Sequence, residues 1–170
     1  MITIFEKFIN NTRNFGNPDF WEMVDVADWN SVISEYIERD GFHNVIRPPI
    51  SDKAKIRLCL NYTYPKIKEF DKEYNVIYNR IYKHFEPFWL TSHQIEQSND
   101  GYSDLISSVI GKGKKFVEMA LNNENLVIEM SKKQEFVENF GYLLNIDEED
   151  YEKIRIKYDP YYLDTRNYNV

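Results

Sequence analysis

Carboxylates recur every three residues beside two tryptophans near the start of the chain. Glu22, Asp25 and Asp28 lie next to Trp21 and Trp29. Residues three apart share one edge of an α-helix, so the spacing predicts a line of carboxylates along a helix. Such groups can do acid–base chemistry, or they can bind a basic protein with the flanking aromatic side chains as interface anchors. We expect these five residues to bind a basic partner, and a purely solvated acidic helix face stays the alternative.

Histidines and acids occur together at a second place that could bind a metal ion. His84, Glu86, His93 and Glu96 are the candidates, and the last two are spaced to face the same way on a helix. A metal site also needs a sufficient number of ligands in convergent geometry, which this spacing does not supply. We therefore expect no metal and no cofactor here.

The segment from Gly111 to Lys115 alternates glycine and lysine, as phosphate-binding loops do. It lacks the P-loop spacing and the Ser or Thr that follows the P-loop lysine. Because a helical apolar period runs through the segment, we expect Gly113 to allow close helix packing while the lysines are solvated.

Cys59 is the only cysteine, which excludes an internal disulfide and a multi-cysteine zinc site. Its apolar neighbours predict a small buried hydrophobic side chain rather than a reactive thiol. The chain also lacks the G-x-S-x-G motif of serine hydrolases. We expect no catalytic residue.

The elements that would position these residues are helices. Asn17, Pro18 and Asp19 supply a cap, a proline at the first helical position and an acid near the positive helix end, so they predict a helix start. A shorter helix is predicted before them, with Thr3 and Glu6 as a capping box. A further helical stripe, ending before Gly41, consists of Trp29, Val32, Ile33, Tyr36 and Ile37.

Prolines divide the middle of the chain. Pro48-Pro49 predicts an extended connection over residues 41–50, after which Ser51 can cap a helix. Pro65 should break or restart that helix, and Pro87 should end or re-aim the next one. We expect Phe88-Trp89-Leu90 to be buried. Between the last two prolines lies the clearest helical stripe, Ile67, Phe70, Tyr74, Ile77, Tyr78, Ile81, Tyr82 and Phe85.

The last third of the chain continues the helical pattern. Asp100-Gly101 predicts a turn, and the apolar stripe from Ile106 to Leu121 predicts one helix after it. Leu126 to Val137 support another helix, closing near Gly141, and Asp147 can cap a last short helix through Ile154. The tail from about residue 158 could contact a partner, pack over the helices or be disordered at its end. Its tyrosines are Tyr158, Tyr161, Tyr162 and Tyr168.

Length and composition suit one folded unit. The chain has 170 residues, of which 42% are hydrophobic and 29% charged, so it can build a core of its own. No strictly alternating apolar run indicates a sheet. The predicted fold is all-α: a compact multi-helix single domain over residues 1–170, with about six or seven helices.

The excess of acidic residues restricts the classes of molecule that the chain is expected to bind. Twenty-one basic and 28 acidic residues give a net charge of −7, which opposes binding to nucleic acid. No stretch approaches the roughly 20 apolar residues that span a bilayer. The first ten residues lack the pattern of a secretory signal, so we expect a cytoplasmic, reducing location and no membrane partner.

Two segments resemble a family of small uncharacterised bacterial domains. Its Asp-Phe-Trp opening corresponds to Asp19-Phe20-Trp21, and a later Asp-Gly-aromatic and glycine-basic helix element corresponds to residues 100–121. Here Ser108-Val109-Ile110 replaces a tryptophan-bearing run, and Gly111 stands where the family more often has Ser. The resemblance implies a helical fold and carries over no catalytic residue. Small proteins of this kind can look like immunity or regulatory proteins.

These observations favour a non-enzymatic acidic protein-binding module. Its partner is expected to be a basic protein, and an immunity or inhibitor protein that occludes a basic toxin is the more specific hypothesis. One alternative is a small metal- or ligand-dependent enzyme whose carboxylates and histidines meet only in three dimensions. Another is an oligomeric regulatory module with exposed aromatic faces, because the sequence leaves the oligomeric state open.

Overall fold

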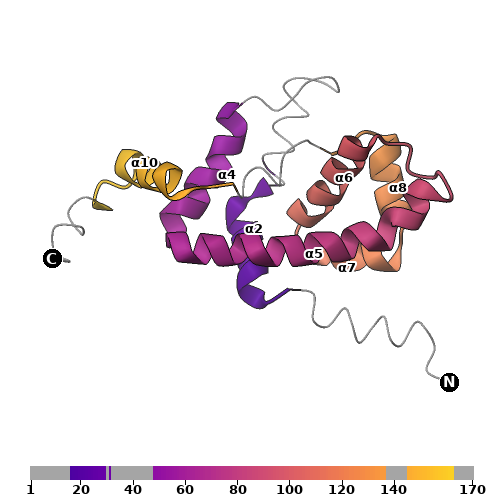
Figure 1. Cartoon of the computed structure of the whole chain (residues 1–170), viewed down its shortest axis with the longest axis horizontal. Coiled ribbons are helices and arrows are strands. Elements are labelled where there is room, and N and C mark those ends of the chain that lie inside the picture. Colours follow the sequence, from indigo (N-terminus) through magenta and orange to yellow (C-terminus); the bar gives the residue numbers. More distant parts are fainter. Residues whose placement is uncertain (1–15, 30, 32–47, 137–144, 163–170) are drawn as a thin grey trace.

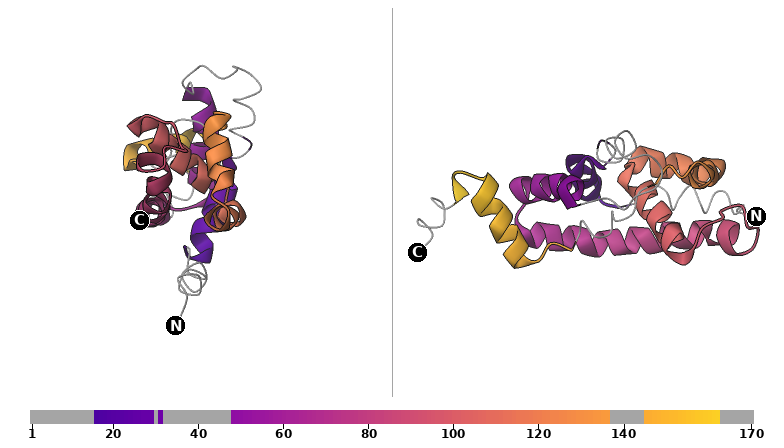
Figure 2. Two further views of the ribbon diagram at one scale, coloured as in Figure 1. Left: turned by 90° about the vertical axis from the view of Figure 1, so that its right-hand side faces the viewer. Right: turned by 90° about the horizontal axis from the view of Figure 1, so that it is seen from above.

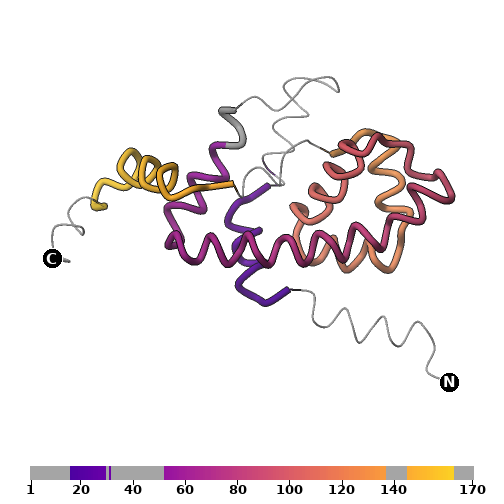
Figure 3. The backbone as a smooth tube through the Cα atoms, viewed as in Figure 1, coloured from indigo at the N-terminus to yellow at the C-terminus, as the bar shows by residue number. Residues whose placement is uncertain are grey.

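The computed structural model describes residues 16–29, 31, 48–136 and 145–162. Within residues 48–136, side chains are described from residue 52 onward. Figure 3 follows the backbone through these segments. Within them every regular element is a helix, which confirms the all-α prediction. The helices are α2 (Pro18–Ala27), α4 (Pro48–Asn61), α5 (Tyr64–Leu90), α6 (Asn99–Gly111), α7 (Lys114–Asn122), α8 (Asn125–Lys132) and α10 (Glu148–Tyr158).

Helix α5 runs along the long axis of the molecule and connects its two ends (Figure 1). Helix α4 lies at one end and packs against α2, which crosses α5 between the two ends, and α6, α7 and α8 pack together at the other end. Helix α10 contacts α4 and lies at the outer side of that end, as the view from above also shows (Figure 2). The buried apolar side chains form one cluster that includes both ends, from Phe20 on α2 to Met130 on α8.

The predicted start of α2 is confirmed in detail. The side chain of Asn17 accepts a hydrogen bond from the Phe20 N–H at 2.9 Å, and Pro18 occupies the first helical turn. Asn17 also donates to the carboxylate of Glu73 on α5, from its backbone N–H at 2.7 Å and from its amide Nδ2 at 2.8 Å. The helix ends at Asp28, which has a left-handed φ of 52°. Both ends of α2 are therefore held in place.

Two proline predictions have opposite outcomes at α4. Pro65 lies in the first turn of α5 directly after α4 ends at Asn61, so the predicted restart is confirmed. The predicted extended connection is wrong for residues 48–50, because Pro48 and Pro49 begin α4. Proline is tolerated in a first turn, where its missing N–H would have no helical acceptor. Ser51 therefore lies inside α4 and is not its cap, and residues 41–47 lie outside the described part of the chain.

Pro87 was predicted to end or re-aim α5. The first alternative is wrong, because Pro87 lies inside the helix, which continues to Leu90. The helix continues because its next turn forms around the proline: the Thr91 N–H donates to the Pro87 carbonyl at 3.1 Å. Trp89 is half-buried and donates from Nε1 to the Gln97 carbonyl at 2.8 Å. Leu90, which was predicted to be buried, is the last residue of α5 and is 53% exposed.

A break at Gly113 divides the stretch that was predicted to be one helix. Helix α6 ends at Gly111 and α7 begins at Lys114, and Gly113 between them has a φ of +87°. Glycine adopts this left-handed region without the steric cost that a Cβ imposes. The predicted turn at Asp100-Gly101 is instead the first turn of α6, in which the Ser98 hydroxyl accepts from the Gly101 N–H at 3.1 Å.

The last helix begins as predicted. The Asp147 side chain accepts from the Asp150 N–H at 2.7 Å, and α10 then continues past Ile154 to Tyr158. Helix α8 confirms a helix at Leu126 to Met130, but it ends at Lys132 and is followed by Gln134 with a φ of 55°, so the prediction that this helix continues to Val137 and closes near Gly141 is wrong. Two other predictions concern residues outside the described part of the chain: the helix near Thr3 and the stripe from Val32 to Ile37.

Candidate functional site

Three carboxylates line one edge of α2 and its C-terminal end. Glu22 and Asp25 are exposed, and the side chain of Asp28 keeps 41% of its surface accessible. The opposite face of α2 is in the core, where Phe20, Met23 and Val24 are almost completely buried. The helix therefore holds the carboxylates on a surface that its buried face keeps in position.

Trp21 and Trp29 are core residues, which corrects the prediction that they flank the carboxylates as exposed anchors. Trp21 is 4% exposed and Trp29 is fully buried. The ring of Trp21 packs edge-on against Phe20, with centroids 4.9 Å apart. Trp29 lies so close to the backbone of α6 that a Cβ at Gly111 would be 2.1 Å from its Cδ1. Neither side chain can contact a partner in this conformation.

Basic side chains neutralise the two ends of this acidic face. The Asp28 carboxylate forms an ion pair with Arg57 on α4 at 3.1 Å and accepts from the Ser31 hydroxyl at 2.7 Å. Near the start of α2, Lys66 contacts the Asp19 carboxylate at 2.8 Å. Exposed ion pairs contribute about 0–1 kcal/mol to stability, but they occupy the charges involved. The carboxylates of Glu22 and Asp25 remain between these pairs.

The surroundings of Glu22 and Asp25 differ. Tyr62 donates its hydroxyl to Glu22 at 3.3 Å, and partial burial together with the Glu22 charge raises the pKa of Tyr62. Asp25 lines a shallow surface hollow with Gly113, three lysines and Glu118. The lysines are Lys112, Lys114 and Lys115. We call Glu22 and Asp25 the α2 carboxylate edge, because they are the exposed acids that lie between the two ion pairs.

The segment from Gly111 to Lys115 is a helix junction. The ammonium of Lys112 lies over the Phe116 ring, 5.3 Å from its centroid, while Lys114 and Lys115 are exposed, as predicted. The predicted close packing belongs to Gly111 and not to Gly113, which instead provides the left-handed turn. Sequence reasoning missed Gly111 because the residue it contacts, Trp29, is distant in the chain.

The histidines and acids of the second candidate site are separated. His84 on α5 is half-buried, its Nε2 lies 3.7 Å from a carboxylate oxygen of Glu124, and burial lowers its pKa while Glu124 opposes the shift. His93 lies in the connection after α5 with a φ of 53°, so the prediction that it shares a helix face with Glu96 is wrong. Among the described residues, no three His, Cys, Asp or Glu side chains are grouped to bind a metal ion.

Cys59 has the predicted character. It is fully buried in α4, and this burial raises the pKa of its thiol to about 11. Because the thiolate is the reactive form, a thiol with this pKa is almost entirely protonated near neutral pH. The prediction of a small buried side chain is confirmed, and its low reactivity stays a prediction.

The described part of the C-terminal tail packs back over α10. The Tyr162 hydroxyl donates to Glu152 at 2.6 Å, and the Arg155 guanidinium lies 4.8 Å from the centre of the Tyr162 ring. Tyr161, by contrast, is 72% exposed. Tyr168 lies outside the described residues, so the alternatives for the end of the tail stay open.

Comparison with known proteins does not add to this picture. No protein-family model, curated protein or solved structure matches the chain. The resemblance to small bacterial helical domains therefore stays a prediction. Among the described helices, none is both long and apolar enough to cross a membrane.

Proposed function

We propose that the chain is a protein-binding module whose α2 carboxylate edge contacts a basic protein. The observation that carries the proposal is the position of Glu22 and Asp25, two exposed carboxylates one helical turn apart on a helix whose other face is core. A contact surface on a rigid, well-packed helix loses little conformational freedom on binding. The net charge of −7 adds a long-range attraction for a basic partner.

The ion pairs at the two ends limit the extent of the contact. Asp19 and Asp28 are already paired with Lys66 and Arg57. A basic partner would gain most from Glu22 and Asp25, while the lysines beside Asp25 would repel its positive charges on that side. The proposed contact is therefore narrow, and it favours a partner with a small cluster of Lys or Arg over one with an extended basic surface. This pattern of attraction and repulsion would contribute specificity.

A finer form of the proposal is that the partner is a basic toxin and that this chain occludes it as an immunity or inhibitor protein, in a reducing cytoplasm. The negative net charge supports a basic toxin as the partner. The single cysteine, Cys59, is buried and free, which supports a reducing location. Co-expression tests it separately: the chain should restore growth to cells that produce the toxin.

Affinity capture from the cells that naturally produce the protein tests the general form. The tagged wild-type chain is compared with a double variant, Glu22→Gln with Asp25→Asn, and with a control, Glu96→Gln with Glu135→Gln, which removes the same charge from exposed residues elsewhere. We expect a stoichiometric basic protein on the wild type and the control, with much less on the α2 variant. A partner retained equally by all three chains, or no basic partner at all, contradicts the proposal.

A further inference from the structure

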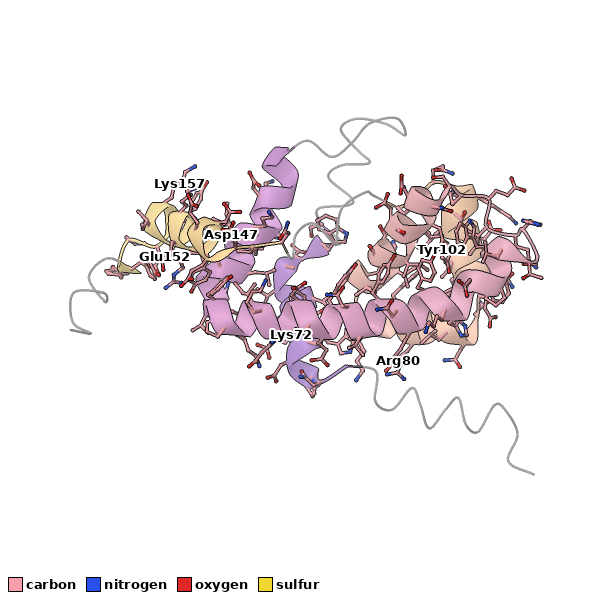
Figure 4. The ribbon with its side chains drawn as sticks, viewed as in Figure 1. Lys72, Arg80, Tyr102, Asp147, Glu152 and Lys157 are labelled. Carbon is pink, nitrogen blue, oxygen red and sulfur yellow. The ribbon has the colours of Figure 1, made fainter. Side chains whose placement is uncertain are left out.

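Helix α10 has fewer buried residues than any other described helix. Of its residues, only Tyr151 is buried, whereas Ile156 and Tyr158 are 49% and 42% exposed. It packs on α4 at the outer end of the molecule, far from the α6–α8 end (Figures 1 and 2). In Figure 4 the labelled side chains Glu152 and Lys157 on α10 lie at the opposite end from Tyr102 on α6. The apolar contacts of α10 with the core come from Tyr151 and the partly buried Ile154, with Ile146 buried just before the helix, so apolar burial holds α10 less strongly than the other described helices.

Polar contacts from Arg155 connect α10 to the end of α4. Its guanidinium Nη1 donates to the carbonyls of Leu60 at 3.0 Å and Cys59 at 3.3 Å, and Nη2 contacts the Asp159 carboxylate at 2.6 Å. The last carbonyls of a helix have no partner within that helix, so Arg155 acts as a cap supplied by another helix. The Nε–H of Arg155 is buried without an acceptor among the described residues. This unpaired donor reduces the net stabilisation that the other Arg155 contacts give to the packing of α10 on α4.

A second polar contact supports the first. The Tyr151 hydroxyl donates to the carbonyl of Tyr62 at 3.1 Å, just beyond the end of α4, and the Tyr151 ring packs 5.7 Å from that of Tyr64. Together, Arg155 and Tyr151 attach α10 to the short connection between α4 and α5. Both contacts end on backbone carbonyls that water can also satisfy when α10 moves away.

Cys59 lies beneath this attachment. Leu58 and Cys59 are both fully buried in the core cluster, but successive residues of a helix are about 100° apart, so the two side chains leave α4 in different directions. Burial raises the pKa of the Cys59 thiol, and the charges of Arg155, Lys55 and Asp150 also act on it. Lys55 and Ile56 of α4 line a surface hollow together with residues of α10, and Cys59 follows them by one helical turn on the same side of α4. Helix α10 therefore covers the side of α4 that carries the thiol.

We propose that α10 is a detachable latch: it leaves α4 as a unit while the other helices stay folded, and in doing so it uncovers Cys59. Regions with few buried apolar contacts open at lower free energy than the global unfolding of a protein. The opening would expose a second surface, around Ile56 and Cys59 on α4, distinct from the α2 carboxylate edge. The latch is a conformational device of the fold and does not depend on the proposed partner.

Thiol labelling tests the latch directly, because Cys59 is the only cysteine. The reaction of the full-length chain with a small aromatic disulfide reagent is followed for the wild type, Arg155→Ala, Arg155→Lys and a core control, Val109→Ala in α6. We expect Arg155→Ala to accelerate labelling about tenfold or more, as the loss of a charged hydrogen bond implies, and Arg155→Lys to have a smaller effect. Val109→Ala should lower the urea midpoint of global unfolding and leave the labelling rate unchanged.

The latch is refuted if labelling follows global stability in every variant, because the thiol would then be reached only by complete unfolding. Hydrogen exchange of the wild-type protein provides a readout that does not depend on any variant folding. The amides of α10 should exchange much faster than those of α5 and α6. Equal protection of α10 and α6 would also overturn the proposal.

Discussion

The contact between Gly111 and Trp29 gives the sharpest test of the packing. Replacing Gly111 with Ala would place a Cβ 2.1 Å from Trp29 Cδ1, 2.9 Å from Cγ and 3.0 Å from Nε1. Carbon atoms prefer separations of about 3.5–4.0 Å, so the ring or the helix would have to move by more than an ångström. Trp29 is fully buried, so its ring cannot turn out into solvent without leaving a cavity.

Two opposing contributions decide whether Gly111→Ala stabilises or destabilises the folded protein. An alanine gains up to about 1 kcal/mol over glycine in a helix, because glycine loses more backbone entropy on folding. Overpacking a core costs about 1–3 kcal/mol and occasionally more, and a clash this close belongs at the upper end. We expect Gly111→Ala to destabilise the protein by about 2 kcal/mol, which corresponds to a fall of roughly 4–8 °C in the melting temperature of a domain of this size.

Circular dichroism melts and urea titrations measure this change, and Gly101→Ala is the matched control. At Gly101 the nearest atom to an added Cβ is the side-chain Oε1 of Gln97, at 2.9 Å, which is the mobile end of a flexible side chain. We expect the control to be neutral or stabilising. If Gly111→Ala were as stable as the wild type, or if both variants shifted alike, the proposed contact between Trp29 and α6 would be refuted.

Three further predictions concern single residues. Asn17→Ala removes the cap of α2 and its bonds to Glu73, and should lower the free energy of unfolding by about 1 kcal/mol, seen as a lower urea midpoint at an unchanged slope. Pro87→Ala should raise the melting temperature, with a gain of about 1–2 kcal/mol, since proline is unfavourable inside a helix; a lower melting temperature would contradict the placement of Pro87. The raised pKa of Cys59, from 9.0 to about 11, means that the folded state holds its proton more tightly, so this group should lower stability as pH rises from 9 to 11 and have no such effect below 9. Cys59→Ala should show a shallower fall in stability over that window, and equal slopes for the two chains would contradict the assignment.

The sequence predicted those features that depend on neighbours in the chain. The cap at Asn17, the restart at Pro65 and the cap at Asp147 are each decided within a few residues, and all three are confirmed. The apolar stripe of α5 is likewise a local pattern, and Ile67, Phe70 and four later members of it are buried.

Features that depend on distant residues could not be predicted. Trp21 and Trp29 lie beside carboxylates in the sequence, but their exposure depends on α5 and α6, which lie much later in the chain. The role of Arg155 is similar, because its acceptors are carbonyls of α4 that no side-chain pattern reveals. Gly113 illustrates a third limit: an apolar period can continue through a helix break when both helices pack on the same core.

The proposed binding function depends most directly on the rate at which the captured basic partner associates with the chain. Surface-capture kinetics at low and physiological salt should compare the wild type, the Glu22→Gln, Asp25→Asn variant and the Glu96→Gln, Glu135→Gln control. Charge attraction at the surface is screened over about 8 Å at physiological ionic strength, so the wild-type and control on-rates should fall as salt rises. The α2 variant should associate more slowly at low salt and show a weaker salt dependence. Equal on-rates and equal salt slopes for all three chains, with helicity intact by circular dichroism, would show that the α2 carboxylate edge does not contact the partner.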